Sequence, residues 1–405
     1  MSTCTIAKSC ASGTVMAPPS KSYAHRLLLA AFLSGKPVTV SNVDFSLDVA
    51  ATLDCISAMG ATVSVEGDQV TITPGSGLLG GDLNCRESGS TLRFMIPVAL
   101  ALHGRGRFTG TEKLFSRGLT QYQNIFSSQG IEYTLGSDSL EAKGALKSGT
   151  FIIDPSQSSQ YITGLLFALP LLDGDSQIFF AKKPQSKPYI DITLDVLKMA
   201  KVEAEYTKSG LFVRGGQKFD LSDTTVEGDW SNAAFLDIYN HIGGDTLVMG
   251  LNKFSLQGDM VYRELFDQLD KGHSKIDISD CIDLGPVLFT LAAVKHGAHF
   301  TGCSRLRIKE SDRIADTLAE LEKIGVKAVV KKDSVKIESV SSEQLAALES
   351  QDILFDSHND HRLAMSLTAL ASIFGARLAG CEAVAKSFPR FFDTIRRLNI
   401  QVTNE

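Results

Sequence analysis

The sequence predicts an α/β protein made of six similar units, arranged as two lobes of three. An amphipathic segment that ends at a small or helix-stopping residue and continues into a β-rich segment recurs along the chain. The recurring segments end near residues 60, 130, 201, 272, 325 and 399, so most are about 70 residues apart. This period is too long for a common solenoid repeat and fits a compact unit of two helices and about four strands.

Each copy is expected to contain a helix followed by a strand. Before each stop, the apolar residues are spaced three or four apart, as on a helix with one buried stripe. Glycine suits the left-handed residue that ends a helix, and the alternating residues that follow suit a half-buried strand. The expected pairs are 53–60 with 61–65, 125–130 with 131–134, 194–201 with 202–206, 265–272 with 276–278, 318–325 with 326–330, and 392–399 with 400–402. Second strands are expected at 68–73 and 334–338.

The composition is that of a globular protein. The chain has 405 residues, of which 43% are hydrophobic and 21% charged, with a formal net charge of -6. This balance excludes collagen-like and mostly disordered proteins, and the acidic charge argues against nucleic-acid binding over the whole surface. The apolar runs at 94–102 and 164–172 are roughly half the length of a membrane span, and residues 1–12 lack a signal-peptide core. We therefore expect a cytoplasmic protein that binds neither nucleic acid nor membrane.

Metal and cofactor motifs are missing from the sequence. None of the seven cysteines forms a CxxC pair, which indicates reduced thiols. The phosphate-loop, dinucleotide, zinc-protease and nucleophile-elbow patterns are also missing. His358 and His361 could share a metal, but no third ligand is evident nearby, so a structural or anion-binding turn is favoured. We expect no metal and no cofactor.

Four apolar helical runs begin with residues suited to holding an anion. Residues 18–26, which include Lys21 and Arg26, precede the first run, and residues 87–93, which include Gly89, precede the second. Hydroxyls and amides at 156–161 precede the third, and residues 359–362 precede the fourth. Free N–H groups and the helix dipole favour an anion at such a start. The alternative is a capped, solvated helix start, but four such segments in one chain favour ligand binding.

Two further segments add positive charge. Residues 305–313 form the densest charged run, in which Lys309 and Arg313 could share one face with an anion at the start of another helix. The alternative for this run is a solvated helix face. Lys386 stands just before a helix that begins at a proline.

Taken together, these segments resemble the EPSP synthase family, the 3-phosphoshikimate 1-carboxyvinyltransferases, which are enolpyruvyl transferases. The resemblance covers nearly the whole chain, and its motifs occur in the family's order. The motifs are 20–22 with Arg26, 88–93, 158–160, 187–193, 227–231, 309–313, 359–362 and 386–389. The resemblance implies a two-lobed inside-out α/β barrel (EPT/RTPC-like) built from six βαβαββ units. It places the first lobe at residues 20–228 and the second at residues 1–19 plus 229–405, and we expect a monomer.

The resemblance also implies the reaction. The enolpyruvyl group of phosphoenolpyruvate is transferred to the 5-hydroxyl of shikimate 3-phosphate through a tetrahedral intermediate, with release of phosphate, in chorismate and aromatic amino acid biosynthesis. The residues implied to hold shikimate 3-phosphate are Lys21, Ser22, Arg26, Ser158, Ser159, Gln160, Ser186, Asp283 and Lys309. Those implied to hold phosphoenolpyruvate are Lys21, Gly89, Arg117, Gln160, Arg313, Arg362 and Lys386.

The resemblance assigns the proton transfers to Asp283 and Glu310, and we expect Lys21 to protonate the departing phosphate. Carboxylates with tuned pKa values suit this work. Without the resemblance, Asp283 would be interpreted as a helix cap within residues 283–286. Because the implied cations come from both lobes, the substrates are expected to draw the lobes together.

Several positions depart from the family pattern. Glu87 stands where asparagine is frequent, Gly118 and Phe94 stand where proline is frequent, and Arg305 replaces a substrate-contacting asparagine.

Two alternatives remain open at this stage. One is the UDP-N-acetylglucosamine enolpyruvyl transferase, which typically has Lys-Asn at the first motif and a loop cysteine, whereas Ser22 follows Lys21 here. The other is a non-catalytic clamshell that binds phosphorylated metabolites, which would not require Asp283 and Glu310.

Overall fold

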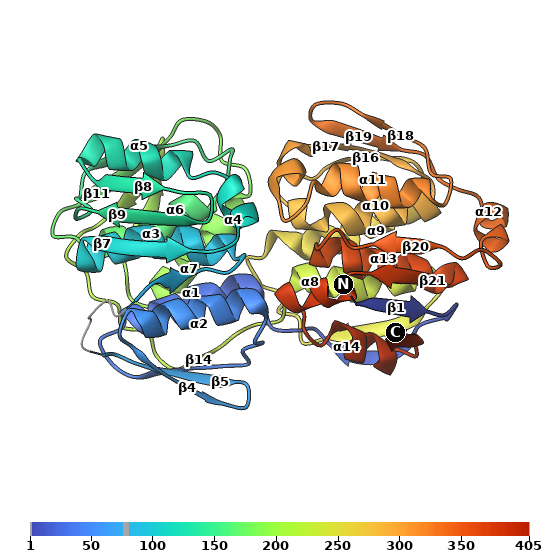
Figure 1. The fold of residues 1–405 in the computed structure, drawn as a ribbon, viewed down its shortest axis with the longest axis horizontal. Helices are drawn as coiled ribbons and strands as arrows, with labels where there is room; N and C mark the ends of the chain where they lie inside the picture. Colours follow the sequence, from blue (N-terminus) through green and yellow to red (C-terminus); the bar gives the residue numbers. More distant parts are fainter. Residues whose placement is uncertain (1, 76–80, 405) are drawn as a thin grey trace. The chain divides into compact units, whose positions relative to one another are not determined.

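The computed structural model describes residues 2–75 and 81–404, and its contacts divide the chain into two compact units (Figure 1). The central unit is Pro19–Glu227. The split unit combines Met1–Pro18 with Gly228–Glu405 and therefore contains both ends of the chain. Each unit has its own hydrophobic core.

The central unit contains three four-stranded mixed sheets. In each sheet, one edge strand pairs in parallel with its neighbour, and the other two adjacent pairs of strands are antiparallel. The strand orders below begin at the edge with the parallel pair. One sheet has the order β14 (Thr224–Thr225), β3 (Val38–Ser41), β5 (Gln69–Thr73) and β4 (Thr62–Glu66). The second has the order β6 (Leu83–Asn84), β7 (Arg105–Thr109), β9 (Ser139–Lys143) and β8 (Glu132–Leu135). The third has the order β10 (Thr150–Ile153), β11 (Ser176–Phe180), β13 (Gly210–Val213) and β12 (Ala204–Thr207).

The split unit repeats this sheet twice. One copy has the order β16 (Ser274–Asp277), β17 (Ala298–Thr301), β19 (Ser334–Ile337) and β18 (Ala328–Val330). The other has the order β20 (Leu354–Asp356), β21 (Ala376–Ala379), β1 (Thr3–Ile6) and β22 (Val402–Asn404). Figure 1 shows β1, from the start of the chain, beside β21. In the other four-stranded sheets the third strand in spatial order is the second strand of a hairpin, namely β5, β9, β13 or β19. Here the N-terminal strand β1 takes that position.

The sixth sheet differs from the expected unit of about four strands. Among the described residues it consists of β2 (Ser12–Met16) and β15 (Asp245–Met249), paired in parallel. Only two residues separate the helix that follows, α9 (Tyr262–Lys271), from β16, so there is no room for a hairpin. The strand expected at 276–278 therefore belongs to the next sheet, which explains why the helix ends near 272 and 325 are closer together than the others.

The helices fall into two groups. Those at the centre of each unit are buried on nearly every residue because their sequences are apolar all round. They are α1 (Lys21–Leu33), α3 (Gly89–His103), α6 (Gln160–Ala168), α8 (Trp230–His241), α10 (Gly285–Val294) and α13 (His361–Phe374). Helix α3 packs along α6, and α10 packs along α13.

The remaining helices bury one stripe or are short. They are α2 (Leu47–Ala58), α4 (Glu112–Ser116), α5 (Thr120–Gln129), α7 (Lys187–Met199), α9, α11 (Arg313–Glu322), α12 (Ser342–Ala347) and α14 (Phe391–Arg397). Short 3₁₀ helices are η1 (Leu169–Leu171), η2 (Gly258–Val261), η3 (Ile282–Leu284), η4 (Ser304–Ile308) and η5 (Cys381–Lys386). Over the described ranges, no helix is both long and apolar enough to cross a bilayer.

Candidate active site

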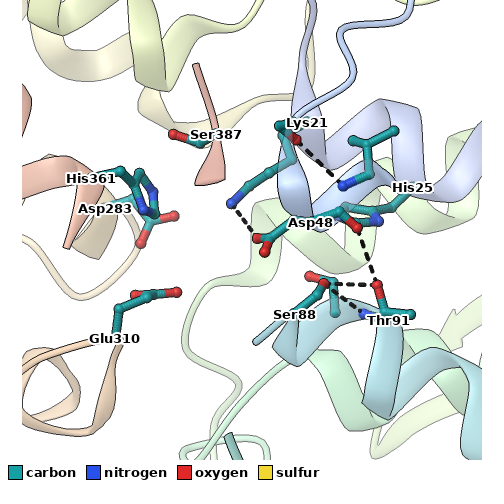
Figure 2. Close-up of polar contacts among 12 residues, drawn as sticks. Lys21, His25, Asp48, Ser88, Thr91, Asp283, Glu310, His361 and Ser387 are labelled. Carbon is teal, nitrogen blue, oxygen red and sulfur yellow. Dashed lines mark hydrogen bonds and ion pairs between the residues drawn. The ribbon is translucent and has the colours of Figure 1, made fainter. Parts of the chain in front are cut away.

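The start of helix α1 in the central unit holds Lys21 against a carboxylate. Ser20 is buried, and its Oγ accepts a hydrogen bond from Tyr23 N (3.4 Å). Lys21 follows, and its Nζ lies 2.9 Å from Asp48 Oδ2 on α2 (Figure 2). The alternative interpretation of this segment was a capped, solvated helix start. The start is capped, but Ser20 is buried, and Asp48 orients the ammonium group of Lys21.

Arg26, one turn further along α1, is buried among neutral groups. Its Nε donates to Thr193 Oγ1 (2.8 Å), its Nη1 to the carbonyl of Ser22 (2.7 Å) and its Nη2 to Thr163 Oγ1 (3.2 Å). Phe94, where the family often has proline, places its ring 5.2 Å from the guanidinium carbon. Burial lowers the pKa of Arg26 to about 10. Within residues 2–75 and 81–404, no carboxylate is hydrogen-bonded to this guanidinium, so neutral groups fix the positive charge in place.

Two guanidinium groups meet at the start of helix α3. A Cβ atom built on Gly89 would lie 2.9 Å from Nη1 of both Arg93 and Arg117. Such a distance is essentially never seen for a real Cβ, so with a side chain at this position the ends of the two flexible arginine side chains would have to shift. Ser88 caps the helix, with its Oγ accepting from Thr91 N (3.2 Å), as Figure 2 shows.

The departure from the family pattern at Gly118 has a structural reason. Its φ is +78°, which proline cannot adopt. In this conformation the Gly118 carbonyl accepts hydrogen bonds from Arg93 Nη2 (3.2 Å) and Tyr161 Oη (2.9 Å). The turn that carries Arg117 is thereby tied to α3 and α6.

The hydroxyl and amide segment before α6 joins this cluster. Gln160 Oε1 accepts from Arg93 Nη1 (3.0 Å), and its Nε2 donates to Ser90 Oγ (3.0 Å). Ser158 Oγ accepts from Gln160 N (3.2 Å), and Ser159 is the buried residue just before the helix. These contacts bring three predicted segments, at 88–93, 117 and 158–160, into one site.

Ser186 occupies the start of α7 in a left-handed conformation, with φ +56°. Its carbonyl accepts from Tyr189 N (3.1 Å), and the Tyr189 carbonyl accepts in turn from Arg26 Nη2 (3.0 Å). The turn at 186–189 is therefore linked to Arg26. A non-glycine residue in this conformation is strained, and such strain concentrates at functional sites.

In the split unit, Arg313 joins three carboxylates. It is 1% exposed, and its Nη1 lies 2.9 Å from Asp283 Oδ1 and its Nη2 2.8 Å from Glu310 Oε2. Its Nε donates to Asp360 Oδ2 (2.7 Å), on a carboxylate that is fully buried. Burial alone would lower the pKa of Arg313, but Asp360, Glu310 and Asp283 together raise it above its ordinary value.

Asp283 is surrounded by cations. In addition to Arg313, Lys309 Nζ lies 3.2 Å from its Oδ1, and Arg362 Nη2 lies 3.7 Å from its Oδ2. The residue just before α10 is Leu284, and no side-chain hydrogen bond caps the start of that helix. The interpretation of Asp283 as a helix cap is therefore wrong, and its side chain, shown with that of Glu310 in Figure 2, belongs to an ionic cluster.

The segment at 359–362 and Lys386 complete the cluster of predicted site residues in the split unit. Asp360 caps α13 by accepting from Arg362 N (2.8 Å), and Arg362 Nη1 donates to Asn232 Oδ1 (3.1 Å). Lys386 is buried, and its Nζ donates to the carbonyl of Asn359 (2.7 Å). The motif at 359–362 was predicted from the sequence, but Asp360 was given no role. Its position just before His361 and Arg362, at the start of a helix, could have identified it as a site residue.

The two histidines do not form a metal site in the described structure. His358 Nε2 lies 2.9 Å from Glu320 Oε1, and its Nδ1 lies 3.7 Å from Asp316 Oδ1. His361 is buried at the first position of α13. Over residues 2–75 and 81–404, no group of three or more potential ligands could hold a metal ion.

The predicted site residues thus form two half-sites, each within one unit. The central half-site contains Lys21, Ser22, Arg26, Gly89, Arg117, Ser158, Ser159, Gln160 and Ser186, and the split half-site contains Asp283, Lys309, Glu310, Arg313, Arg362 and Lys386. Sequence reasoning missed Asp48, Arg93 and Asp360 as members. Arg93 lies within the motif at 88–93. Its position four residues after Gly89 could have identified it as a member of the site.

Comparison with known proteins decides the family. The model of the EPSP synthase (3-phosphoshikimate 1-carboxyvinyltransferase) family matches residues 7–395. The chain belongs to the EPSP synthase family. The 3-phosphoshikimate 1-carboxyvinyltransferase of Clostridium kluyveri is 38% identical over 414 residues, covering 96% of each chain. That of Clostridium beijerinckii is 36% identical over 422 residues, covering 96% of this chain and 95% of the relative.

Solved structures agree on the fold. EPSP synthase from Acinetobacter baumannii matches all of both chains with a TM-score of 0.78 at 20% identity. The enolpyruvyl transferase NikO from Streptomyces tendae matches all of this chain and 98% of its own, with a TM-score of 0.77 at 14% identity. The predicted enolpyruvyl-transferase fold and the family resemblance are both confirmed.

Proposed function

We propose that this EPSP synthase family member transfers the enolpyruvyl group of phosphoenolpyruvate to the 5-hydroxyl of shikimate 3-phosphate, as the shikimate pathway requires. The observation that carries the proposal is the pair Asp283 and Glu310, both bonded to the buried Arg313 guanidinium. By the motif resemblance described above, these two carboxylates correspond to the family's acid/base positions. The family model covers residues 7–395 of the chain. A non-catalytic binding protein would have no need for such a pair.

The central half-site supplies the binding groups for anions. Arg26 and the hydroxyls of Ser22, Ser158, Ser159 and Ser186 suit the phosphate and hydroxyls of shikimate 3-phosphate. At the start of α3, Gly89 lets an anion come close to the guanidiniums of Arg93 and Arg117. Together with Gln160, this arrangement suits phosphoenolpyruvate. Arg362 and Lys386 of the split half-site would add positive charge for the same substrate.

The split half-site supplies the proton transfers. In the addition step, the 5-hydroxyl loses its proton and bonds to C2 of phosphoenolpyruvate, while C3 gains a proton and becomes a methyl group. In the elimination step, the methyl group loses a proton, the bond from C2 to the phosphate oxygen breaks, and phosphate leaves. We assign these transfers to Asp283 and Glu310, with Lys309 beside the sugar hydroxyl and Lys21 protonating the phosphate.

The charged neighbours of Asp283 support this assignment. Three cations contact or approach its carboxylate, which favours the ionised form needed to accept a proton. The proposed reaction uses no metal and no cofactor. A monomer in the cytoplasm remains our expectation for the working enzyme.

The test is release of inorganic phosphate from phosphoenolpyruvate by the purified protein. We expect release with shikimate 3-phosphate as acceptor, and none with UDP-N-acetylglucosamine or with no acceptor. Release with the UDP-sugar alone would favour the sister enzyme. No release with either acceptor, together with measurable binding of both substrates, would favour the non-catalytic clamshell.

A further inference from the structure

A chain of four buried polar side chains joins three helices of the central unit, and the proposed function assigns none of them to a substrate. His25 belongs to α1, Thr52 to α2 and Thr91 to α3, and Ser88 caps the start of α3. Each of these side chains is at most 2% exposed. Polar groups buried this deeply are costly unless they are hydrogen-bonded, so breaking one link of the chain has an effect on its neighbours.

The contacts run without a break from α1 to the start of α3. His25 Nδ1 lies 2.7 Å from Thr52 Oγ1, which in turn lies 2.7 Å from Thr91 Oγ1. Thr91 Oγ1 donates a hydrogen bond to Ser88 Oγ (2.7 Å). Figure 2 shows this bond together with a longer one from Thr91 Oγ1 to the Asp48 carbonyl (3.4 Å).

The donors along the chain follow from the number of protons, because each hydroxyl has only one. Thr91 directs its proton toward Ser88 and the Asp48 carbonyl, so Thr52 must donate to Thr91. Thr52 then has no proton left for His25, and the imidazole must donate from Nδ1. The chain therefore requires the tautomer of His25 that carries its proton on Nδ1.

The surroundings of the imidazole agree with this tautomer. His25 Nε2 is buried and has no hydrogen-bond partner among the described residues, so a proton placed there would lack an acceptor. Burial lowers the pKa of His25 well below its ordinary value, and the charges of Lys21 and Arg26 lower it further. The ring is therefore neutral.

The two ends of the chain lie beside groups proposed to bind different substrates. His25 immediately precedes Arg26, which is proposed to hold shikimate 3-phosphate, and Ser88 immediately precedes Gly89, at the proposed phosphoenolpyruvate site. The chain thus connects binding groups of the two substrates through hydrogen bonds between side chains of three helices.

Helix α2 also ties the chain to Lys21. The carboxylate of Asp48 lies 2.9 Å from Lys21 Nζ, and the carbonyl of the same residue accepts the longer bond from Thr91. Thr52 is one turn further along this helix. The position of the ammonium group therefore depends on the same helix that carries the central link of the chain.

We propose that Thr52 is a positioning residue: as the central link of the chain, it fixes the start of α3 relative to α1 and thereby places phosphoenolpyruvate for attack by the 5-hydroxyl of shikimate 3-phosphate. The proposal rests on the proposed function, because that function supplies the two substrates. A misplacement of about 1 Å between reacting groups can cost about 10²-fold in rate. Loss of the link is therefore expected to lower kcat more than the affinity for either substrate.

The first test compares Thr52→Val, which keeps the shape and removes the hydroxyl, with Thr52→Ser, which keeps the hydroxyl and removes a methyl group. We expect kcat of T52V to be about tenfold lower and that of T52S to stay within about twofold of the wild type. The affinity for shikimate 3-phosphate alone, measured by calorimetry, should change less than about twofold in both.

Thr368→Val is the matched control. The Thr368 hydroxyl is equally buried, but it donates only to the Ala364 carbonyl of its own helix (2.7 Å), so we expect wild-type kcat in T368V. A role in packing alone would make T52S the more impaired of the two Thr52 variants, because it lacks the methyl group. That order would overturn the proposal, as would a normal kcat in T52V.

A second pair of variants tests the other end of the chain and serves if T52V does not fold. In His25→Asn the amide can take the place of Nδ1, whereas in His25→Gln it takes the place of Nε2. Because the chain uses Nδ1, we expect kcat of H25N to exceed that of H25Q by about tenfold. Equal kcat values, or the reverse order, would overturn the proposal.

A third measurement does not depend on activity. The ¹⁵N chemical shifts of the imidazole, assigned by comparison with H25N, should show His25 protonated on Nδ1 and not on Nε2 between about pH 6 and pH 8. A proton on Nε2 would overturn the proposal. Absence of phosphate release by the wild type would overturn the proposed function and, with it, this role of Thr52, whereas release that T52V leaves unchanged would overturn only the role.

Discussion

Buried arginines in the two half-sites are held in opposite ways, whereas Lys21 of the central half-site pairs with a carboxylate, Asp48. In the central unit, Arg26 is bonded to hydroxyls and carbonyls, and Arg93 to a carbonyl and an amide oxygen. In the split unit, Arg313 is bonded to three carboxylates. The pKa values reflect the difference, because burial lowers that of Arg26 to about 10, whereas the carboxylates raise that of Arg313 despite its burial.

This difference separates two tasks. A cation held by neutral groups keeps its attraction for an incoming anion, so the central half-site is suited to binding phosphate and carboxylate groups. A cation held by carboxylates instead fixes those carboxylates in place and tunes their proton affinity, so the split half-site is suited to proton transfer. Arg313 was predicted from the family resemblance as a ligand of phosphoenolpyruvate. It remains a predicted ligand, but its observed contacts are those of a group that organises acids.

The largest expected effect is on turnover in the split half-site. Glu310→Gln removes the proton-carrying charge while keeping the shape, so we expect phosphate release to fall by about 10²- to 10⁴-fold, the usual contribution of a general acid or base. Substrate affinity, measured by calorimetry, should change little. Glu322→Gln, at the exposed end of α11, is the control and should be normal. Near-normal turnover of E310Q would remove Glu310 from its role.

The next effect tests the contrast between the two arginines directly. Arg313→Met leaves Asp283, Glu310 and the buried Asp360 without their shared cation, so we expect a loss of about 3–5 kcal/mol in the free energy of unfolding. Arg26→Met leaves only neutral groups without a donor, so the expected loss is about 1–3 kcal/mol. Urea denaturation of the two variants measures the difference. Equal losses would mean that the carboxylates are not held as ions by Arg313.

A smaller effect is expected at the start of α3. Gly89→Ala places a methyl group against the guanidiniums of Arg93 and Arg117, which must then move apart. We expect KM for phosphoenolpyruvate to rise about tenfold, which corresponds to ~1.4 kcal/mol, with little change for shikimate 3-phosphate. Gly35→Ala serves as control, since nothing lies within 4 Å of its added methyl group. An unchanged KM in G89A would show that this pair of cations does not hold the substrate.

The smallest effect concerns the ion pair of Lys21. Asp48→Asn removes the charge that orients the Lys21 ammonium in a partly exposed pair. A pair of this kind contributes about 1 kcal/mol, so we expect kcat/KM to fall only about fivefold. Asp54→Asn on the same helix, in the more exposed pair with Arg86, is the control and should have no effect on kinetics. A loss in D48N as large as that in E310Q would place Asp48 among the catalytic groups.

The sequence by itself determined the fold class, the family and most members of the candidate site. Apolar periodicity reports which helices and strands form, and ordered motifs report the family, because both are properties of residues that are near one another in the chain. The helix starts at residues 21, 89, 160 and 361 were found in this way.

Only the tertiary structure decided which charges meet. The contact of Asp360 with Arg313 spans 47 residues, and that of Thr91 with Thr52 spans 39, so no local pattern encodes them. The sheet that consists, among the described residues, of β2 and β15 was equally hidden, because α9 ends at the position that the period predicts although no hairpin follows it there. Spacing along the chain fixes local conformation, whereas the pKa of a carboxyl group depends on burial and on charges brought near it through space.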